Sequence, residues 1–292
     1  MDVDIERVTD THCATGEGPL WHPDEGVLYW TDIPNGRLYC YDPASDDYER
    51  VLDDDVALGG FTIQEDGSLL CFRGGGRVDQ FVGGEIVPVT VVDAATHTRF
   101  NDVIADPEGR VYAGTMPTSE GPGRLYRLNT DGTVTEADEY GYDIPNGMGF
   151  TPDGEHFYVT ESNAKTVYLY DYDRQTGRLT DRRPFLDLTG ENGIPDGMTV
   201  DATGDVWSAR WNGEVVVRYG SDGTERDRLS FPAKKVSCVT FGGPGYKDIY
   251  VATALDGGDR STEGDGAGAL FRFDAPNGVT GSPEFRSAVE TE

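Results

Sequence analysis

A polar turn signal recurs along the whole chain at nearly constant spacing. Its six occurrences start at residues 23, 65, 107, 152, 202 and 244, which gives intervals of 42, 42, 45, 50 and 42 residues. Most combine Pro, Asp or Glu with a following Gly, as in Pro23-Asp24-Glu25-Gly26, and such combinations are typical of tight turns. A period of about 40 to 50 residues predicts a repeat architecture of six similar units.

Two short runs rich in aromatic and β-branched residues follow each turn. The first runs cover residues 27–30, 68–72, 111–114, 157–160, 206–209 and 249–252. The second runs cover residues 37–41, 77–81, 124–128, 166–170, 215–219 and 269–273. Such runs between Gly, Asp and Pro clusters favour strands over helices. We therefore predict an all-β fold, a six-bladed β-propeller with four-stranded blades around a central channel, in one domain spanning residues 1–292.

Ring closure is the part of this fold that the repeats do not specify. A closed ring leaves no exposed sheet edge, so one further strand is expected in the last blade. The segment before Glu17 and the tail after Pro276 are both candidates for that strand.

The chain is strongly acidic, with a formal net charge of −29 and a pI near 4.3. The acidic residues are spread over all repeats, which favours a solvated surface over a tail that recruits a basic partner. Concentrated salt would screen the self-repulsion of such a surface, so we interpret the charge balance as salt adaptation, typical of a protein from a halophile. A nucleic-acid partner is not expected.

The cysteines and the N-terminus bear on the compartment. The four cysteines, at positions 13, 40, 71 and 238, form no CxxC pair, so we expect buried thiols, without a zinc motif or a disulfide framework. Residues 1–6 are acidic and lack the apolar core of a secretory signal, and no run of 18 apolar residues exists. We expect a cytoplasmic protein without a membrane partner, a monomer or a weak oligomer.

Polar residues recur at one fixed offset from the turns. Six residues before each turn stand, in chain order, Glu17, Gly59, Asn101, Asn146, Asp196 and Cys238. Equivalent positions in successive blades are related by rotation about the central axis, so these side chains should meet at one mouth of the channel. Two carboxylates held close together repel each other unless a cation or a proton intervenes.

A divalent cation bound by Glu17, Asn146 and Asp196 would resolve this repulsion. All three side chains offer oxygen, which favours Ca²⁺, Mg²⁺ or Mn²⁺, with zinc and ferrous iron as alternatives. Asn101 is expected to face either the cation or a ligand.

Each of these motifs also has a purely structural interpretation. Asn146 and Asp196 lie in two Ile-Pro-x-Gly-Met pentapeptides, and Pro-Asn-Gly or Pro-Asp-Gly usually forms a tight turn. The same tripeptide occurs at residues 34–36 and 276–278, outside the common register. Glu17 could be a surface residue of a glycine turn. The shared pentapeptide and the shared offset favour a site.

Arg99 stands two residues before Asn101 and has two interpretations as well. It could simply pair with Asp102 or another carboxylate of this acidic chain. Near a cation it would instead be a fixed donor fork for an anionic or polyhydroxylated substrate.

A set of motifs spread over nearly the whole chain occurs in a distinctive order. They are Gly16-Glu17-Gly18-Pro19-Leu20-Trp21, Arg99-Phe100-Asn101-Asp102, Ala113-Gly114-Thr115-Met116, Asn146-Gly147-Met148, Ile194-Pro195-Asp196-Gly197-Met198 and Phe241-Gly242-Gly243. In this order they resemble the SMP-30/gluconolactonase/regucalcin family. The resemblance implies a six-bladed propeller that hydrolyses a sugar lactone, such as gluconolactone or xylonolactone, to the aldonic acid.

The resemblance also implies roles for single residues. One catalytic divalent cation would be held by the three residues proposed above, and Arg99 and Asn101 would contact the substrate. Some members of the family use an acidic residue shortly after the Gly-Thr-Met segment. That segment is shortened here, and Glu120 is the candidate for this substrate contact.

These assignments suggest a mechanism and leave two alternatives. The cation would act as a Lewis acid on the lactone carbonyl, and Asp196 would be the general base that takes a proton from water. The same arrangement would also suit a metal-dependent phosphotriesterase or esterase, because the pocket walls determine the electrophile. A non-catalytic calcium-binding propeller is the other alternative.

Overall fold

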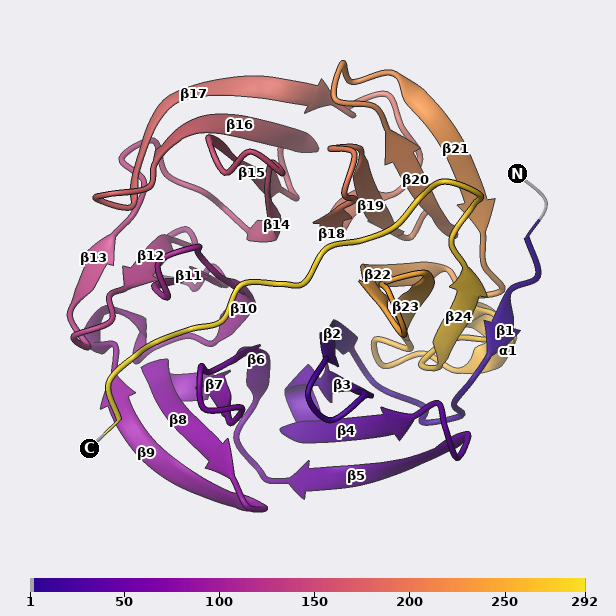
Figure 1. Cartoon of the computed structure of the whole chain (residues 1–292), viewed down its shortest axis with the longest axis horizontal. Coiled ribbons are helices and arrows are strands. Elements are labelled where there is room, and N and C mark those ends of the chain that lie inside the picture. The colour runs from indigo at the N-terminus through magenta and orange to yellow at the C-terminus, as the bar shows by residue number, and fades with distance from the viewer. Residues whose placement is uncertain (1–2, 292) are drawn as a thin grey trace.

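Six four-stranded antiparallel sheets form a ring around a central axis (Figure 1). This computed structural model describes residues 3–291, and it confirms the predicted six-bladed propeller. Both sets of predicted runs are strands, and they form the second and third strands of the blades. The innermost strand of every blade lines the channel (Figure 1).

The strands follow one another from the channel outward in each blade. Blade 1 contains β2 (Gly16–His22), β3 (Val27–Asp32), β4 (Arg37–Asp42) and β5 (Asp47–Asp53). Blade 2 contains β6 (Leu58–Ile63), β7 (Leu69–Arg73), β8 (Arg77–Val82) and β9 (Glu85–Val91). Blade 3 contains β10 (Phe100–Ala105), β11 (Val111–Thr115), β12 (Leu125–Leu128) and β13 (Val134–Glu136).

The second half of the chain repeats this order. Blade 4 contains β14 (Pro145–Phe150), β15 (His156–Glu161), β16 (Thr166–Asp173) and β17 (Arg178–Asp187). Blade 5 contains β18 (Ile194–Val200), β19 (Val206–Trp211), β20 (Val215–Tyr219) and β21 (Glu225–Ser230). Blade 6 contains β22 (Lys235–Gly242), β23 (Asp248–Ala254), β24 (Leu270–Asp274) and the N-terminal β1 (Glu6–Arg7).

The N-terminal segment therefore closes the ring, because β1 pairs antiparallel with β24. The C-terminal segment, residues 275–291, instead crosses one face of the ring from blade 6 towards blade 2 (Figure 1). It is tied to the blades by backbone hydrogen bonds such as Ser287 N to Ile63 O at 2.8 Å and Ala288 N to Gly109 O at 2.8 Å. The two alternatives for closure are thus resolved in favour of the N-terminal segment.

Helical structure is confined to short connections. The helical elements of the described chain are η1 (Ile33–Asn35), η2 (Gly74–Gly76), η3 (Asp93–Ala95) and α1 (Arg260–Glu263). No helix within residues 3–291 is long and apolar enough to cross a membrane. The four cysteines are free thiols, and all except Cys40 are buried.

The hydrophobic core consists of six layers, one between each pair of neighbouring blades. One layer joins Trp207 and Val216 of blade 5 to Val239 and Phe271 of blade 6. Another joins Trp30 of blade 1 to blade 6, which seals the ring where its ends meet. Burying each sheet face against the next blade is the source of stability that a propeller repeat lacks in isolation.

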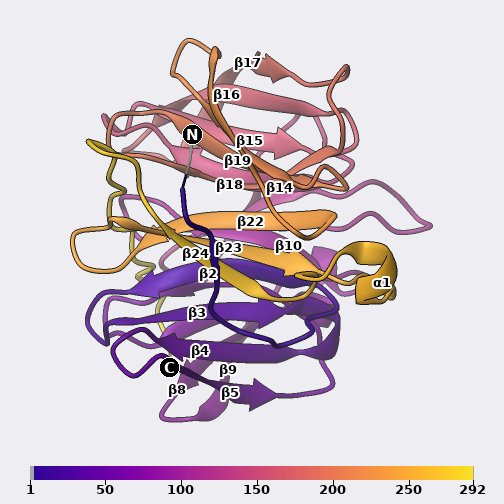
Figure 2. The same cartoon turned by 90° about the vertical axis from the view of Figure 1, so that its right-hand side faces the viewer.

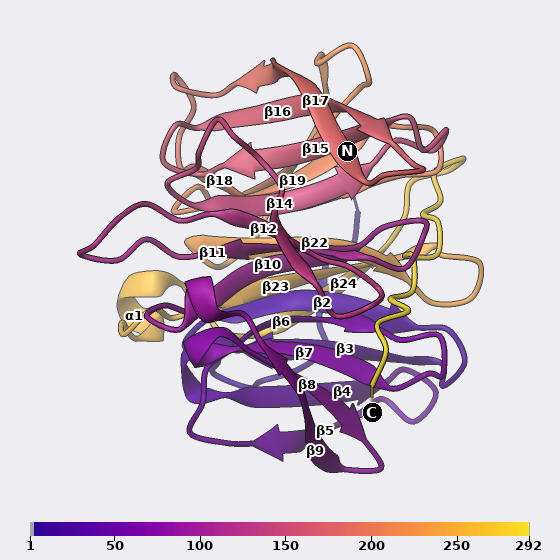
Figure 3. The same cartoon turned by 90° about the vertical axis from the view of Figure 1, so that its left-hand side faces the viewer.

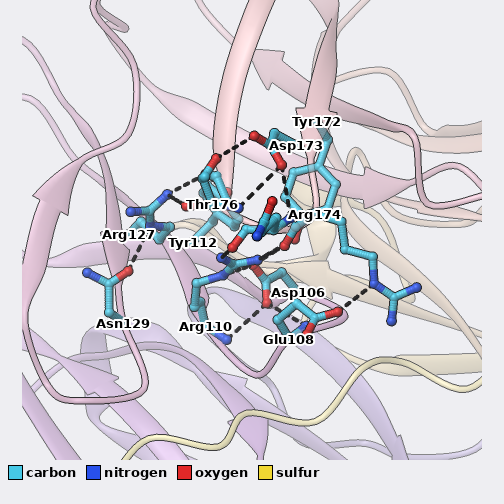
Figure 4. Close-up of polar contacts among 12 residues, drawn as sticks. Asp106, Glu108, Arg110, Tyr112, Arg127, Asn129, Tyr172, Asp173, Arg174 and Thr176 are labelled. Carbon is cyan, nitrogen blue, oxygen red and sulfur yellow. Dashed lines mark hydrogen bonds and ion pairs between the residues drawn. The ribbon is translucent and has the colours of Figure 1, made fainter.

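One junction between blades is polar as well as apolar (Figure 4). Asp106 in blade 3 is fully buried and accepts hydrogen bonds from Arg110 Nε at 2.5 Å and from Tyr172 Oη of blade 4 at 2.8 Å. Arg174 Nε in the β16–β17 turn donates to Glu108 Oε1 at 2.5 Å. We call these five residues the blade 3–4 junction. Both of its acidic side chains have a guanidinium partner.

Candidate active site

A cavity of about 270 Å³ opens at one mouth of the channel. It is lined by Thr15, Glu17, Ile33, Arg99, Asn101, Met116, Ile144, Asn146, Ser162, Asn163, Ile194, Asp196, Trp211 and Asp256. Asp256 belongs to the loop that leads into α1, and α1 lies on the face opposite the C-terminal segment (Figure 2, Figure 3). The cavity therefore opens on the face that the C-terminal segment leaves uncovered.

The inner strands place the predicted residues at this mouth. Glu17, Asn101, Asn146 and Asp196 lie in the first three residues of β2, β10, β14 and β18. At this level the pairing of each inner strand with the second strand of its blade is interrupted by a shift of register. Such β-bulges redirect side chains and are frequent beside active sites.

The two Pro-x-Gly segments of the site are strands and not turns. Gly147 and Gly197 follow Asn146 and Asp196 within β14 and β18. A Cβ on Gly147 would collide with the carbonyl oxygen of Asp196, so glycine lets the two inner strands approach each other.

The two Pro-Asn-Gly tripeptides outside the register, at residues 34–36 and 276–278, have a turn-like backbone instead. Gly36 and Gly278 have φ angles of 59° and 84°, the left-handed conformation that is usual in turns. Register along the repeat, and not the tripeptide itself, separates the site from the turns.

Two of the three carboxylates that line the cavity, those of Glu17 and Asp196, are electrostatically strained. Burial, followed by the charge of Asp102, raises the pKa of Asp196 to about 8. Burial, followed by the charges of Asp196 and Asp102, raises the pKa of Glu17 well above its usual value. Asn146 Nδ2 donates a short hydrogen bond to Asp196 Oδ1.

Arg99 supplies positive charge to this cavity. Its Nη1 donates to Asn101 Oδ1 at 3.0 Å and to the carbonyl oxygen of Phe100 at 2.9 Å. Burial lowers the pKa of the Arg99 guanidinium, while the charges of Glu17 and Asp196 oppose this shift. Within residues 3–291 Arg99 makes no ion pair with Asp102, so it faces the cavity and not a structural partner.

The opposite end of the channel carries two further carboxyl groups. Asp102 and Glu284 of the C-terminal segment line a separate pocket of about 60 Å³. Burial raises the pKa of Asp102 to about 6. Burial and the charge of Asp102 raise the pKa of Glu284 to about 7. The channel is therefore rich in carboxyl groups along its whole length.

Comparison with known proteins identifies the family of this arrangement. The family model for the SMP-30/Gluconolactonase/LRE-like region matches residues 15–255. This chain belongs to the SMP-30/gluconolactonase/LRE-like family. The match includes every residue that was predicted from the sequence to form the site.

Members of this family extend over the full length of the chain. The pentonolactonase XacC of Haloferax volcanii is 52% identical over 292 residues, with 98% of each chain covered. Human regucalcin is 34% identical over 291 residues, with 93% of this chain and 94% of regucalcin covered. The crystal structure of the calcium-binding protein regucalcin from Agrobacterium tumefaciens superimposes with a TM-score of 0.88 at 26% identity, covering 97% of both chains.

Not every residue that the sequence analysis selected lines the cavity of this family member. Glu120 is exposed in a bridged turn between Thr118 and Gly121, and it is not among the lining residues. Gly59, the register position of blade 2, contributes no side chain. Cys238, the register position of blade 6, lines the pocket at the opposite end of the channel.

The cavity also contains residues that the sequence analysis missed. Met116, Ser162, Trp211 and Asp256 each stand two to four residues beyond a run that was predicted to form the second strand of a blade. They lie at or just beyond the ends of the second strands β11, β15, β19 and β23. Counting two residues beyond these runs would have located Met116, Ser162 and Trp211, but not Asp256.

The donor set of this cavity suits a divalent cation. Glu17, Asn146 and Asp196 present two carboxylates and an amide, all hard oxygen donors. The guanidinium of Arg99 faces two carboxyl groups, those of Glu17 and Asp196, so their full ionisation leaves a formal excess of one negative charge, and the charge of Asp102 also acts on both carboxyl groups from the channel. A bound divalent cation would compensate that excess and reverse the upward pKa shifts.

Proposed function

We propose that this protein hydrolyses sugar lactones to the corresponding aldonic acids with the help of one divalent cation held by Glu17, Asn146 and Asp196. The observation that carries the proposal is the convergence of these residues with Arg99 and Asn101 on one open cavity. The full-length relationship to a pentonolactonase supports a five-carbon aldonolactone such as xylonolactone, with gluconolactone as the six-carbon alternative. The cavity volume suits a small ligand of this kind.

The cation and the residues of the cavity have different roles in hydrolysis. When bound, the cation supplies Lewis-acid polarisation of the lactone carbonyl oxygen. Asp196 Oδ1 accepts a hydrogen bond from Asn146, whereas Oδ2 accepts none from residues 3–291, so Oδ2 is open to the cation and to a water molecule. Asp196 takes one proton as the water oxygen bonds to the carbonyl carbon.

Ring opening completes the reaction. The bond between the carbonyl carbon and the ring oxygen breaks, and the ring oxygen receives the proton that Asp196 holds. Water is thereby divided between the new carboxyl group and the new hydroxyl group. Arg99 and Asn101 hold the substrate hydroxyls during these steps, because the guanidinium is fixed by its bonds to Asn101 and to Phe100 O.

A substrate panel tests the proposal directly. The purified protein is assayed with xylonolactone, gluconolactone, an aryl ester and a phosphotriester, each with added Ca²⁺, Mg²⁺ or Mn²⁺ and with EDTA. We expect acid release from the lactones that EDTA abolishes and that the preferred cation restores. Faster turnover of the phosphotriester or ester would transfer the activity to those classes. Cation binding without any turnover would support the non-catalytic alternative.

Several finer assignments are part of this proposal. Ca²⁺, Mg²⁺ and Mn²⁺ fit the oxygen donors best, with zinc and ferrous iron as alternatives. Glu120 reaches a substrate hydroxyl only if the turn at 118–121 approaches the cavity. A cytoplasmic location, a monomeric or weakly oligomeric state and the lack of nucleic-acid and membrane partners stay predictions.

A further inference from the structure

Ser162 lies beside the proposed cation ligands without being a ligand candidate itself. It follows β15 directly, its exposed fraction is 4%, and it lines the cavity. Its backbone N–H donates to Ile144 O at 3.1 Å, next to the start of β14. The main chain of Ser162 is therefore fixed against the strand that carries Asn146.

The single hydroxyl hydrogen of Ser162 is donated to one main-chain acceptor. Ser162 Oγ donates to the carbonyl oxygen of Pro195 at 2.9 Å. A hydroxyl has only one hydrogen, so towards its other neighbours Ser162 Oγ can act only as an acceptor. Its partner on that side is Asn146 Nδ2 at 3.2 Å.

The amide of Asn146 is thereby oriented. One of its two N–H groups points to Ser162 Oγ, and the other to Asp196 Oδ1. A rotation of the amide by 180° would set Oδ1 against two acceptor oxygens. In the observed orientation Asn146 Oδ1 meets only the N–H of Gly147, at 3.0 Å. The remaining lone pair of Oδ1 has no competing side chain among the described residues.

Ser162 also joins two ligand strands. Pro195 directly precedes Asp196 in β18, while Asn146 lies in the neighbouring β14. One hydroxyl thus connects the backbone beside one proposed ligand to the side chain of another. Groups that orient metal ligands through such contacts commonly contribute about 10- to 100-fold in affinity.

We infer that Ser162 is a positioning residue that holds the Asn146 amide with its oxygen available to the cation. The inference rests on the proposed function only in requiring a cation at this cavity, and it holds for any substrate. Removing the hydroxyl would allow Asn146 to present nitrogen in place of oxygen.

The test is the cation affinity of Ser162→Ala, measured on the full-length protein by isothermal titration with Ca²⁺, Mg²⁺ and Mn²⁺ separately. We expect the affinity for the preferred cation to fall by about 10-fold or more. The matched control is Ser68→Ala in blade 2. Ser68 Oγ also donates to one oxygen, Asp66 Oδ1 at 2.6 Å, and accepts from an amide, Gln80 Nε2 at 2.7 Å. We expect wild-type affinity from the control, and thermal unfolding without cation verifies that both variants are folded.

A double-mutant cycle separates orientation from general damage to the cavity. In Asn146→Asp the side chain has two equivalent oxygens, so no orientation remains to be set. Ser162→Ala should then cost much less affinity when it is combined with Asn146→Asp than when it is made in the wild type. An equal loss in both backgrounds, or wild-type affinity in Ser162→Ala alone, would overturn the inference. Cation binding with the expected cycle but no lactone hydrolysis would support the inference and overturn the substrate assignment.

Discussion

The channel-mouth cavity and the blade 3–4 junction both bury charged groups, and they treat them in opposite ways. At the junction the buried Asp106 is matched by Arg110, and the exposed Glu108 by the exposed Arg174 (Figure 4). In the cavity Arg99 alone faces the carboxyl groups, and the pKa of Asp196 rises to about 8. The paired charges at the junction hold two blades together. The cavity carboxylates lack such partners and are arranged to bind a group that the chain itself does not supply.

This difference distinguishes structural from functional carboxylates without reference to relatives. A buried ion pair with complete hydrogen bonding is costly to break, but it has no donor or acceptor free to bind a ligand. A group of buried carboxylates with raised pKa values lowers the stability of the protein alone, and such groups concentrate at functional sites. Mutations in the cavity should therefore change turnover, whereas mutations at the junction should change the free energy of unfolding.

The largest expected effect is on turnover, from Asp196→Asn. The variant keeps the size of the side chain but removes the proposed base and one cation ligand. Loss of a general base typically lowers the rate by about 10²- to 10⁴-fold, so lactone turnover should fall by at least 100-fold at saturating cation. Hydrolysis of xylonolactone and gluconolactone followed by acid release measures it.

The same variant should gain stability when no cation is present. A neutral amide at position 196 removes a buried carboxyl group that is repelled by Asp102. The cation-free variant should thus unfold at a higher temperature than the cation-free wild type. Normal turnover, or a large loss of stability, would place Asp196 with the structural carboxylates.

The next largest effect is expected at the junction, from Asp106→Asn. This change leaves the buried Arg110 guanidinium without its counter-charge, which typically costs about 3–5 kcal/mol in unfolding free energy. Urea unfolding measures the loss. The kcat of the folded fraction should stay at the wild-type value, and a drop in kcat that parallels Asp196→Asn would remove the distinction between the two regions.

The fold could be predicted from the repeat because each blade has the same pattern, a polar turn followed by two strand-forming runs. The second and third strands of each blade were predicted from aromatic and β-branched runs; the second strands are almost entirely buried, and the third strands are largely so. The outer strands were not predicted individually, because they are largely exposed and polar. β5 reads Asp-Tyr-Glu-Arg-Val-Leu-Asp, and no residue of it is fully buried. Such a segment gains its strand conformation from pairing with β4, which sequence alone does not show.

The site was predictable to the extent that it follows the register. Glu17, Asn146 and Asp196 were selected by their common offset, and the structure brings them to one cavity. The position of Ser162 could have been found by counting from the second strand, but its role depends on a hydrogen bond to the carbonyl of Pro195, a main-chain contact without any residue-type signal. The bulges that redirect the inner strands are likewise backbone features. Salt adaptation depends on solvent and stays a prediction.

Cation binding should stabilise the wild type by an intermediate amount. A ligand at 100 times its Kd adds about 2.7 kcal/mol when it binds only the folded state. Thermal unfolding after EDTA treatment, with and without the preferred cation, measures this gain. Asp106→Asn should show the same gain from its lower starting point, whereas Asp196→Asn should show little. Equal gains in all three proteins would mean that the stabilising cation binds elsewhere.

The smallest expected effect concerns Glu284, at the far end of the channel, and it depends on pH. Burial raises the pKa of Glu284 to about 7, against about 4.3 for an unfolded chain. The folded state therefore holds this proton more tightly. The resulting stability is present in full below pH 4 and is lost as the pH rises through 7. Glu284→Gln is neutral throughout and should not show that loss.

Relative to the wild type, Glu284→Gln should gain about 1–3 kcal/mol in unfolding free energy between pH 5 and pH 8.5. Urea unfolding at both pH values, without cation, measures the difference. Glu290→Gln changes an exposed residue of the same C-terminal segment and should follow the wild type at both pH values. Parallel behaviour of all three proteins would show that the Glu284 carboxyl is compensated in the folded protein, as the junction carboxylates are. A gain confined to high pH would extend the uncompensated region from the cavity through the channel to the segment that covers its other end.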